Sequence, residues 1–302
     1  MSDKTMRKLY ALLLLSLASQ WALAEPVTIE HKGLVLNASL ETADETWQQK
    51  PVILMTHGTL AHGQMEIMAT LQELFSERGY SSLPISLSLG LSERTGMYDC
   101  PVPHNHKHTD AIEEIGLWQQ WLTGQGVDSI ILLGHSRGGN QTAWYASELK
   151  EGSPVKGTVL IAPASNGFDY LAADYKKRYE VDLAPLVEKA NKLVADGKGD
   201  TMMENVDFIY CQKTSATAAS FANYYADDPR METTYILKEF SQPVMVFAGS
   251  EDTVVVNLEE KIEALGEKEN IQMSVIDGAD HFFRDLYAED LADETVEFIE
   301  SL

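Results

Sequence analysis

The chain has 302 residues, of which 44% are hydrophobic and 9% aromatic, so it is long enough to bury one large core. It carries 46 acidic against 23 basic side chains, a formal net charge of −23. Such a charge excludes nucleic acid and anionic membrane surfaces as natural partners, because both would repel the protein. The composition indicates one globular domain with room for an insertion.

The first residues have the pattern of an export signal. Basic residues precede an apolar run at 9–18, and the small-residue sequence Ala-Leu-Ala follows at 22–24. The run is too short to cross a bilayer core of about 30 Å as a helix. We therefore predict that residues 1–24 are a signal peptide cleaved near Ala24, that the mature protein is periplasmic or secreted, and that it has no stable membrane span.

Beyond the signal, apolar runs of strand length alternate with helical patterns. The opening segment 27–40 predicts an antiparallel edge hairpin that turns at Gly33. Strands are then expected at 51–56, near 80–85, and at 129–133, 155–161, 243–248 and 271–276, with helices between them, for example at 65–78 and 138–149. This alternation is typical of an α/β fold with a mostly parallel central sheet and helices on both faces.

One segment interrupts the alternation, since residues 163–240 show charged helical patterns and an aromatic-rich stretch but no convincing strand. A loop of that length without structure is improbable in a compact domain, so we predict an inserted helical cap. The predicted organisation is one α/β domain formed by residues 25–163 and 240–302, with the cap at 164–239.

Ser136 lies in the sequence Gly-His-Ser-Arg-Gly, directly after an apolar strand and directly before a helix. A serine on such a tight turn exposes its hydroxyl, and the glycines on either side leave room for the chains packed against it. The strand before the motif makes a nucleophile more probable than a turn serine. We predict that Ser136 is a catalytic nucleophile.

A neutral serine needs a base, and His281 follows the last predicted strand in the sequence Gly-Ala-Asp-His. Asp252 follows the preceding strand, which completes the order Ser, Asp, His of a catalytic triad. Asp169, after the strand that follows the serine helix, is the rival carboxylate with a structural rationale. Asp252 remains the better prediction because the loop before the histidine strand is the expected place.

The oxyanion that forms in acyl transfer needs preorganised donors, and we predict that the backbone N–H groups of Thr59 and Arg137 supply them. Thr59 follows the sequence Thr-His-Gly, in which a glycine permits a sharp turn after the strand. Neighbouring side chains that are candidates for substrate contact are His57, Leu60, His62 and His135.

Together, the sequences Thr-His-Gly at 56–58, Gly-His-Ser-Arg-Gly-Gly at 134–139, Gly-Ser-Glu-Asp at 249–252 and Gly-Ala-Asp-His at 278–281 resemble the landmarks of the α/β-hydrolase superfamily. The resemblance spans residues 52–302 without the cap. It implies an eight-stranded fold and acyl-transfer hydrolysis, but it does not imply a substrate.

Two further groups of residues lie outside the triad. Cys100 and Cys211 are predicted to form a disulfide that ties the cap to the catalytic domain, the alternative being two unrelated thiols. His104, His106 and His108 alternate along one segment and share a face, so they could bind a metal. Because no carboxylate or cysteine stands at a fitting spacing, we expect no metal there and favour a solvated or substrate-contacting loop.

The sequence thus predicts a serine hydrolase that cleaves a carboxylic ester of a small-molecule acyl substrate, without a cofactor. A peptidase, thioesterase or acyltransferase would use the same triad. A non-catalytic binding protein on the same fold is a third hypothesis, and the complete set of catalytic positions argues against it. The sequence leaves the oligomeric state and the substrate open.

Overall fold

The computed structural model describes residues 24–302, so the predicted signal peptide lies outside the described residues except for Ala24. In chain order the elements are β1 (Glu25–His31), β2 (Leu34–Leu40), β3 (Val52–Thr56), α1 (Glu66–Glu77), β4 (Ser82–Ser86), α2 (Asp110–Gly124), β5 (Ile130–His135), α3 (Arg137–Ser147), β6 (Val155–Ile161), α4 (Phe168–Tyr179), α5 (Leu183–Ala195), β7 (Met202–Phe208), β8 (Cys211–Thr217), α6 (Ala218–Tyr224), α7 (Thr233–Leu237), β9 (Val244–Gly249), α8 (Leu258–Glu263), β10 (Ile271–Ile276) and α9 (Leu286–Glu300). Short 3₁₀ helices lie at Trp47–Gln49 and Pro229–Met231.

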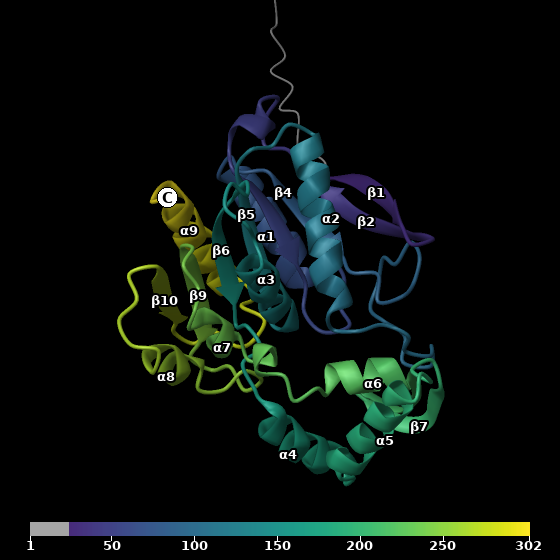
Figure 1. Ribbon diagram of the computed structural model, residues 1–302. Helices are drawn as coiled ribbons and strands as arrows, with labels where there is room; N and C mark the ends of the chain where they lie inside the picture. Colours follow the sequence, from purple (N-terminus) through teal and green to yellow (C-terminus); the bar gives the residue numbers. More distant parts are fainter. Residues whose placement is uncertain (1–23) are drawn as a thin grey trace, which may run out of the picture.

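A central eight-stranded sheet has the order β1-β2-β4-β3-β5-β6-β9-β10 (Figure 1). Six neighbouring strands of this sheet, β4, β3, β5, β6, β9 and β10, are parallel to one another. Strands β1 and β2 form the antiparallel hairpin predicted at the edge, and β2 pairs with β4 in the antiparallel sense. The hairpin turns at Gly33, whose φ of 80° favours glycine. The α/β fold predicted from the sequence is therefore confirmed.

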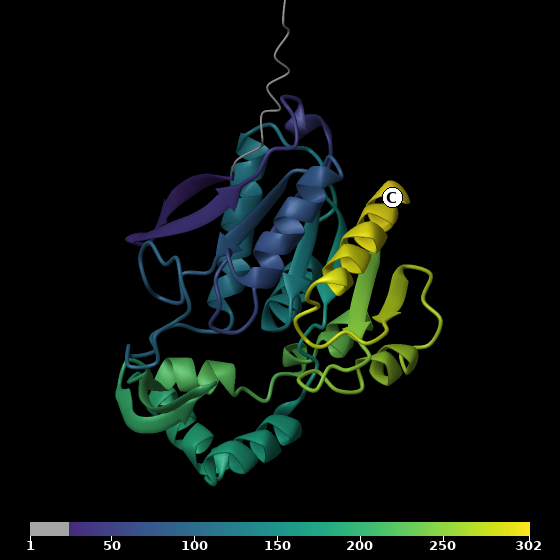
Figure 2. The same cartoon turned by 180° about the vertical axis from the view of Figure 1, so that it is seen from behind.

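The central strands are apolar along their whole length because both faces of the sheet are covered. On one face, Leu54 and Leu132 pack with α2 and α3 in one buried cluster. On the other face, Met55 and Leu133 pack with α1 and α9 in a second cluster (Figures 1 and 2). Successive residues of a strand thus enter opposite cores, which explains the continuous apolar runs in the sequence.

The segment between β6 and β9 differs from the prediction of a purely helical cap. It contains α4, α5 and α6, and it also contains β7 and β8, which form an antiparallel hairpin. We name residues 164–239 the cap segment. Most of its elements lie together at the end of the sheet opposite the chain's start (Figure 1).

The hairpin was missed because its strands have few of the usual signals. Its turn at Ile209 and Tyr210 contains no glycine, asparagine or aspartate, although Ile209 adopts a positive φ of 56°. Many strand positions are polar, and only Met203, Val206 and Phe208 mark a buried face in β7. Burial against the rest of the protein, rather than local sequence, explains these strands.

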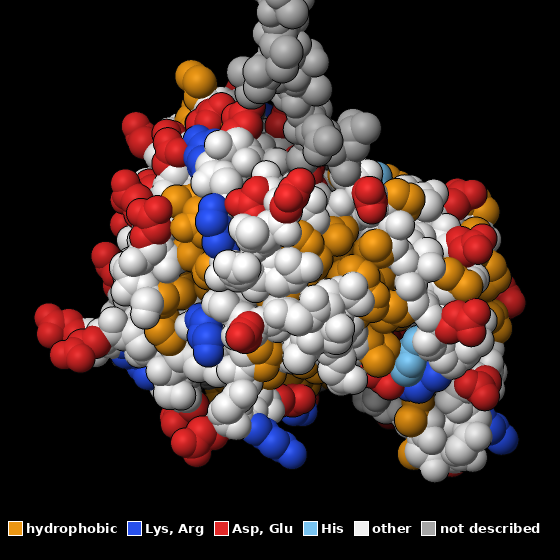
Figure 3. Space-filling model, turned by 90° about the horizontal axis from the view of Figure 1, so that it is seen from above, with side chains coloured by type: hydrophobic (Ala, Val, Ile, Leu, Met, Phe, Trp, Pro, Cys, Tyr) orange, Lys and Arg blue, Asp and Glu red, His pale blue; other side chains and the backbone are white. Residues whose placement is uncertain are grey.

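The surface reflects the acidic composition. Figure 3 shows carboxylate side chains scattered over one face of the molecule, with fewer lysines and arginines between them. Within residues 24–302, no helix is long and apolar enough to cross a membrane.

Candidate active site

Ser136 occupies the sharp turn between β5 and α3, with φ 57° and ψ −124°. Its amide donates to the carbonyl of Ile161 at 2.9 Å, which fixes the turn to the neighbouring strand β6. A Cβ atom added at Gly138 would lie 2.7 Å from the carbonyl oxygen of Thr56, so only glycine permits this approach. The local backbone is thus strained and held in place from two sides, as expected where a side chain must be presented.

His281 and Asp252 come from the loops after β10 and β9, and both side chains meet Ser136. Nε2 of His281 lies 3.0 Å from Oγ of Ser136, and Nδ1 of His281 lies 2.8 Å from Oδ2 of Asp252. Because a carboxylate only accepts, Nδ1 carries the proton and Nε2 accepts from the serine hydroxyl. The structure therefore brings the three predicted residues together in one chain of hydrogen bonds.

The environment of Asp252 favours its ionised form. Burial alone would raise its pKa, but the hydrogen bond from His281 and the amides of Val254 and Val255 outweigh burial and lower the pKa. Asp169, the rival carboxylate, lies exposed in the first turn of α4. The structure pairs His281 with Asp252 and not with Asp169.

Thr59 and Arg137 each present a backbone amide beside the Ser136 turn. Among residues 24–302, neither amide donates to a protein acceptor. The loop that carries Thr59 passes close to the serine, since a Cβ atom at Gly58 would lie 3.2 Å from Cβ of Ser136. Leu60 follows with a positive φ of 56° and is buried. Two unused amides near a serine hydroxyl are an arrangement that can bind an oxyanion.

His57 and His135, two candidates for substrate contact, instead hold the loops in place. Nε2 of His57 accepts from the amide of Leu87 at 3.0 Å, and Arg94 also points to this nitrogen. Nε2 of His135 donates to the carbonyl oxygen of His281 at 2.9 Å. Burial lowers the pKa of each imidazole to about 3, so both stay neutral.

His62 is the remaining histidine among these candidates. Its side chain is half-buried, and its Nδ1 is itself buried and finds no partner in the part of the chain that the structure describes. Burial, with the nearby charge of Arg94, lowers its pKa. Arg94, which is buried and donates to the carbonyls of Leu87 and Gly96, stands in no motif that could have singled it out from the sequence.

The side chains of His104, His106 and His108 are buried, whereas Asn105 and Lys107 between them are exposed, which corrects the expectation of a solvated loop for the three imidazoles. Nδ1 of His106 lies 2.8 Å from the Tyr224 hydroxyl of the cap segment, and Nε2 of His108 donates to Asn140 at 2.9 Å. Burial lowers the pKa of His104 to about 4 and of the other two to about 3. No metal-binding group of His, Cys, Asp or Glu is found among residues 24–302.

The same segment is bonded to the cap segment. Cys100 and Cys211 form the predicted disulfide, with Cα atoms 5.2 Å apart. Beyond it, the amide of His104 donates to the carbonyl of Ser215 at 2.8 Å, so this segment runs alongside β8. These bonds join residues more than 100 positions apart and anchor the cap beside the site.

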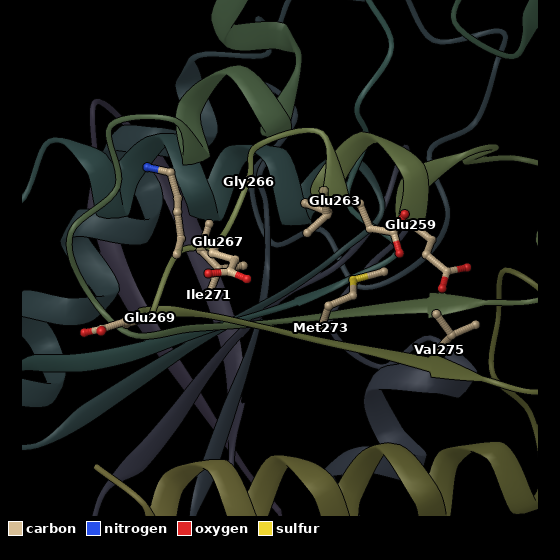
Figure 4. A pocket seen from close by; sticks show the side chains of 10 residues that line it. Glu259, Glu263, Gly266, Glu267, Glu269, Ile271, Met273 and Val275 are labelled. Carbon is tan, nitrogen blue, oxygen red and sulfur yellow. The ribbon is translucent and has the colours of Figure 1, made fainter.

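A pocket of about 620 Å³ lies elsewhere, between α8 and the edge strand β10 (Figure 4). Apolar side chains of β10 form part of its wall, and several glutamates line it. It contains none of the site residues predicted from the sequence.

Comparison with known proteins identifies the family and the fold. A family model described as the alpha/beta hydrolase family matches residues 53–297. Similar solved structures include Est1E from Butyrivibrio proteoclasticus (16% identity, 91% of this chain and 99% of that chain covered, TM-score 0.63) and an esterase from Pyrococcus furiosus (17%, 93% and 91%, 0.61). The alpha/beta hydrolase GrgF from Penicillium sp. sh18 is comparably similar (16%, 92% and 98%, 0.63).

No curated protein sequence matches the chain. Because the solved structures share so few identical residues with this chain, their similarity establishes the fold alone. The family model, in contrast, matches most of the chain. The chain therefore belongs to the alpha/beta hydrolase family.

Proposed function

We propose that the protein is a serine hydrolase that cleaves a carboxylic ester, with Ser136 as nucleophile, His281 as general base and Asp252 as the residue that orients the base. The observation that carries this proposal is the chain of hydrogen bonds from the Ser136 hydroxyl through His281 to Asp252. Support also comes from the strained turn at Ser136, because strain of this kind is common where a side chain must react.

In the proposed first half-reaction, Nε2 of His281 takes the proton of the Ser136 hydroxyl as Oγ attacks the ester carbonyl carbon. The carbonyl oxygen becomes an oxyanion, and the amides of Thr59 and Arg137 donate to it. His281 then gives the proton to the departing alkoxide, which leaves as the alcohol while the acyl group stays on Ser136. The ionised carboxylate of Asp252 stabilises the imidazolium form of His281 during this step.

In the second half-reaction, a water molecule gives a proton to His281 and attacks the acyl-enzyme. The second tetrahedral intermediate collapses, Oγ of Ser136 recovers the proton from His281, and the acid leaves. No cofactor or metal takes part in this mechanism. The role proposed for His135 is to hold the loop of His281, since it donates to the His281 carbonyl.

The proposal extends to the protein's organisation and location. Residues 164–239 serve as a cap over a catalytic domain formed by 25–163 and 240–302, supported by the bonds that connect the cap to the segment 100–109. Export is supported by the pattern of residues 1–24 and by the disulfide, because such bonds persist in oxidising compartments.

The test combines labelling with variants. A fluorophosphonate probe is expected to label the purified protein at Ser136 and to leave Ser136→Ala unlabelled. Ester hydrolysis by Ser136→Ala is expected to fall by on the order of 10⁴-fold or more. Asp252→Asn should be severely impaired, and the matched control Asp169→Asn should retain the wild-type rate.

A folded protein that neither reacts with the probe nor hydrolyses any acyl ester would refute the proposal and favour a binding protein. Esters are favoured over other acyl compounds by the esterase among the similar structures, which share the fold at low identity. A panel of acyl esters, thioesters and aminopeptide substrates separates an esterase from a thioesterase or a peptidase. An added alcohol acceptor that captures the acyl group would reveal an acyltransferase.

A further inference from the structure

The side chain of Arg137 lies at the junction between the catalytic sheet and the cap segment. Its Nε donates to the Thr59 hydroxyl at 3.1 Å, one terminal nitrogen lies 3.4 Å from Nδ1 of His108, and Cζ lies 5.3 Å from the centre of the Tyr224 ring. His108 donates through its other nitrogen to Asn140, and burial lowers its pKa to about 3, so it is neutral. The positive charge of Arg137 therefore touches only neutral groups.

This environment differs from that of the other arginines between residues 24 and 302. A carboxylate oxygen lies within 4 Å of each of Arg78, Arg178, Arg230 and Arg284. Arg94 has no such contact, but it donates to two backbone carbonyls, and its charge interacts with the buried carboxyl of Glu114.

Among the arginines of residues 24–302, only Arg137 has a side chain that donates to nothing but a hydroxyl and an imidazole. The chain has twice as many acidic as basic residues, so carboxylate partners are abundant elsewhere. A guanidinium has five N–H donors, and those of Arg137 beyond the two contacts have no acceptor within residues 24–302. The side chain is also half-buried, where an unmatched charge is costly.

We propose that Arg137 binds a carboxylate on the acyl part of the substrate, so that the site selects esters whose acyl chain ends in an acid. This inference rests on the proposed function, because it assigns a substrate class to the same site. A planar guanidinium with unused paired N–H groups matches a carboxylate in geometry as well as charge. Thr59, His108 and Tyr224 already hold the guanidinium, so little side-chain entropy is lost on binding.

The acyl part is indicated by the position of the guanidinium. Arg137 is hydrogen-bonded to Thr59, whose amide is proposed to bind the carbonyl oxygen. Within the described chain, no hydrogen bond links its side chain to His281, which is proposed to protonate the leaving alcohol. The chain is strongly acidic, and carboxylates are scattered over the face shown in Figure 3, so the overall charge would repel an acid and selection must come from a local positive group.

The experiment compares two fluorogenic esters that differ only in charge. One is the 4-methylumbelliferyl monoester of adipic acid, with a free carboxylate, and the other has a primary amide in place of that carboxylate. The measured quantity is the ratio of kcat/KM for the acid ester to kcat/KM for the amide ester. It is determined for the wild type, Arg137→Gln, Arg137→Lys and the control Arg178→Gln, which removes one positive charge from an exposed ion pair on α4.

We expect the wild type to prefer the acid ester by about tenfold or more, because the amide ester lacks one charge-assisted hydrogen bond that the acid ester makes with Arg137. Arg137→Gln should bring the ratio close to one, Arg137→Lys should keep part of the preference, and Arg178→Gln should keep the wild-type ratio. A wild type without preference for the acid ester, or an Arg137→Gln variant with the wild-type ratio, would overturn the inference. Hydrolysis of either ester that depends on Ser136 would leave the proposed function standing in both cases.

Discussion

Acidification is expected to unfold this protein over a narrow range of pH, because the folded protein buries several neutral histidines. Burial is the main cause in each case, and it lowers the pKa to about 4 for one imidazole and to about 3 for the others, against an ordinary value of 6.5. These residues are His57, His104, His106, His108 and His135. A group with a lowered folded-state pKa contributes stability that is present above its unfolded pKa and is lost as the pH falls towards its folded pKa.

The magnitude follows from proton uptake on unfolding. Between about pH 6 and pH 4, each of these histidines binds a proton when the chain unfolds, which removes about 1.4 kcal/mol per pH unit. The five together remove about 7 kcal/mol per pH unit. Glu114 opposes them, because burial raises its pKa to about 7 and the folded state then binds a proton first. The net slope is therefore about four protons, or roughly 5 kcal/mol per pH unit.

Such a slope consumes the stability of an ordinary domain, about 5–15 kcal/mol, within one to three pH units. The assay is urea unfolding followed by tryptophan fluorescence at several pH values between 8 and 5, with the disulfide intact. His106→Gln should lower the stability at pH 8, since it disturbs the contact with Tyr224, and should flatten the slope by about one proton. A wild-type slope of fewer than two protons between pH 6 and pH 5 would refute the reasoning.

Three further predictions concern single positions. Glu114→Gln can keep the hydrogen bonds to Ser88 but no longer titrates. The free energy of unfolding of the wild type should therefore fall by about 3 kcal/mol relative to the variant as the pH rises from 5 to 8, and parallel profiles of urea stability against pH would contradict this. Reduction of the disulfide, or Cys211→Ser, removes a link across 111 residues and should lower the free energy of unfolding by about 4–5 kcal/mol in the chain-entropy model. The measurement is the Tm, which should fall, and an unchanged Tm in reductant would contradict the prediction. Gly138→Ala places a methyl group against backbone oxygens and should cost about 1–3 kcal/mol, with a large loss of the proposed esterase activity. Gly124→Ala, with open space around it, should be tolerated, and equal unfolding midpoints of the two variants would count against the packing argument.

The sequence by itself determined the class of fold and the residues of the candidate site. Strands buried on both faces need continuous apolar runs, so β3, β5 and β9 could be recognised without knowledge of their neighbours. The turn at Ser136 has a local cause as well, since glycines must stand where the helix packs against the chain. The order of Ser136, Asp252 and His281 along the chain was therefore enough to predict which side chains would meet.

Only the tertiary structure decided what surrounds these residues. The hairpin of β7 and β8 lacks a turn signal and depends on contacts with the rest of the protein, so no local pattern predicts it. His106 finds its partner Tyr224 118 positions away, and a sequence segment gives no sign of such a partner. Burial there is decided by contacts between the cap segment and the loop segment 100–109, and Arg137 beside them has no carboxylate partner among residues 24–302. Such non-local contacts determine charge state and selectivity, because both depend on which groups exclude water from a side chain.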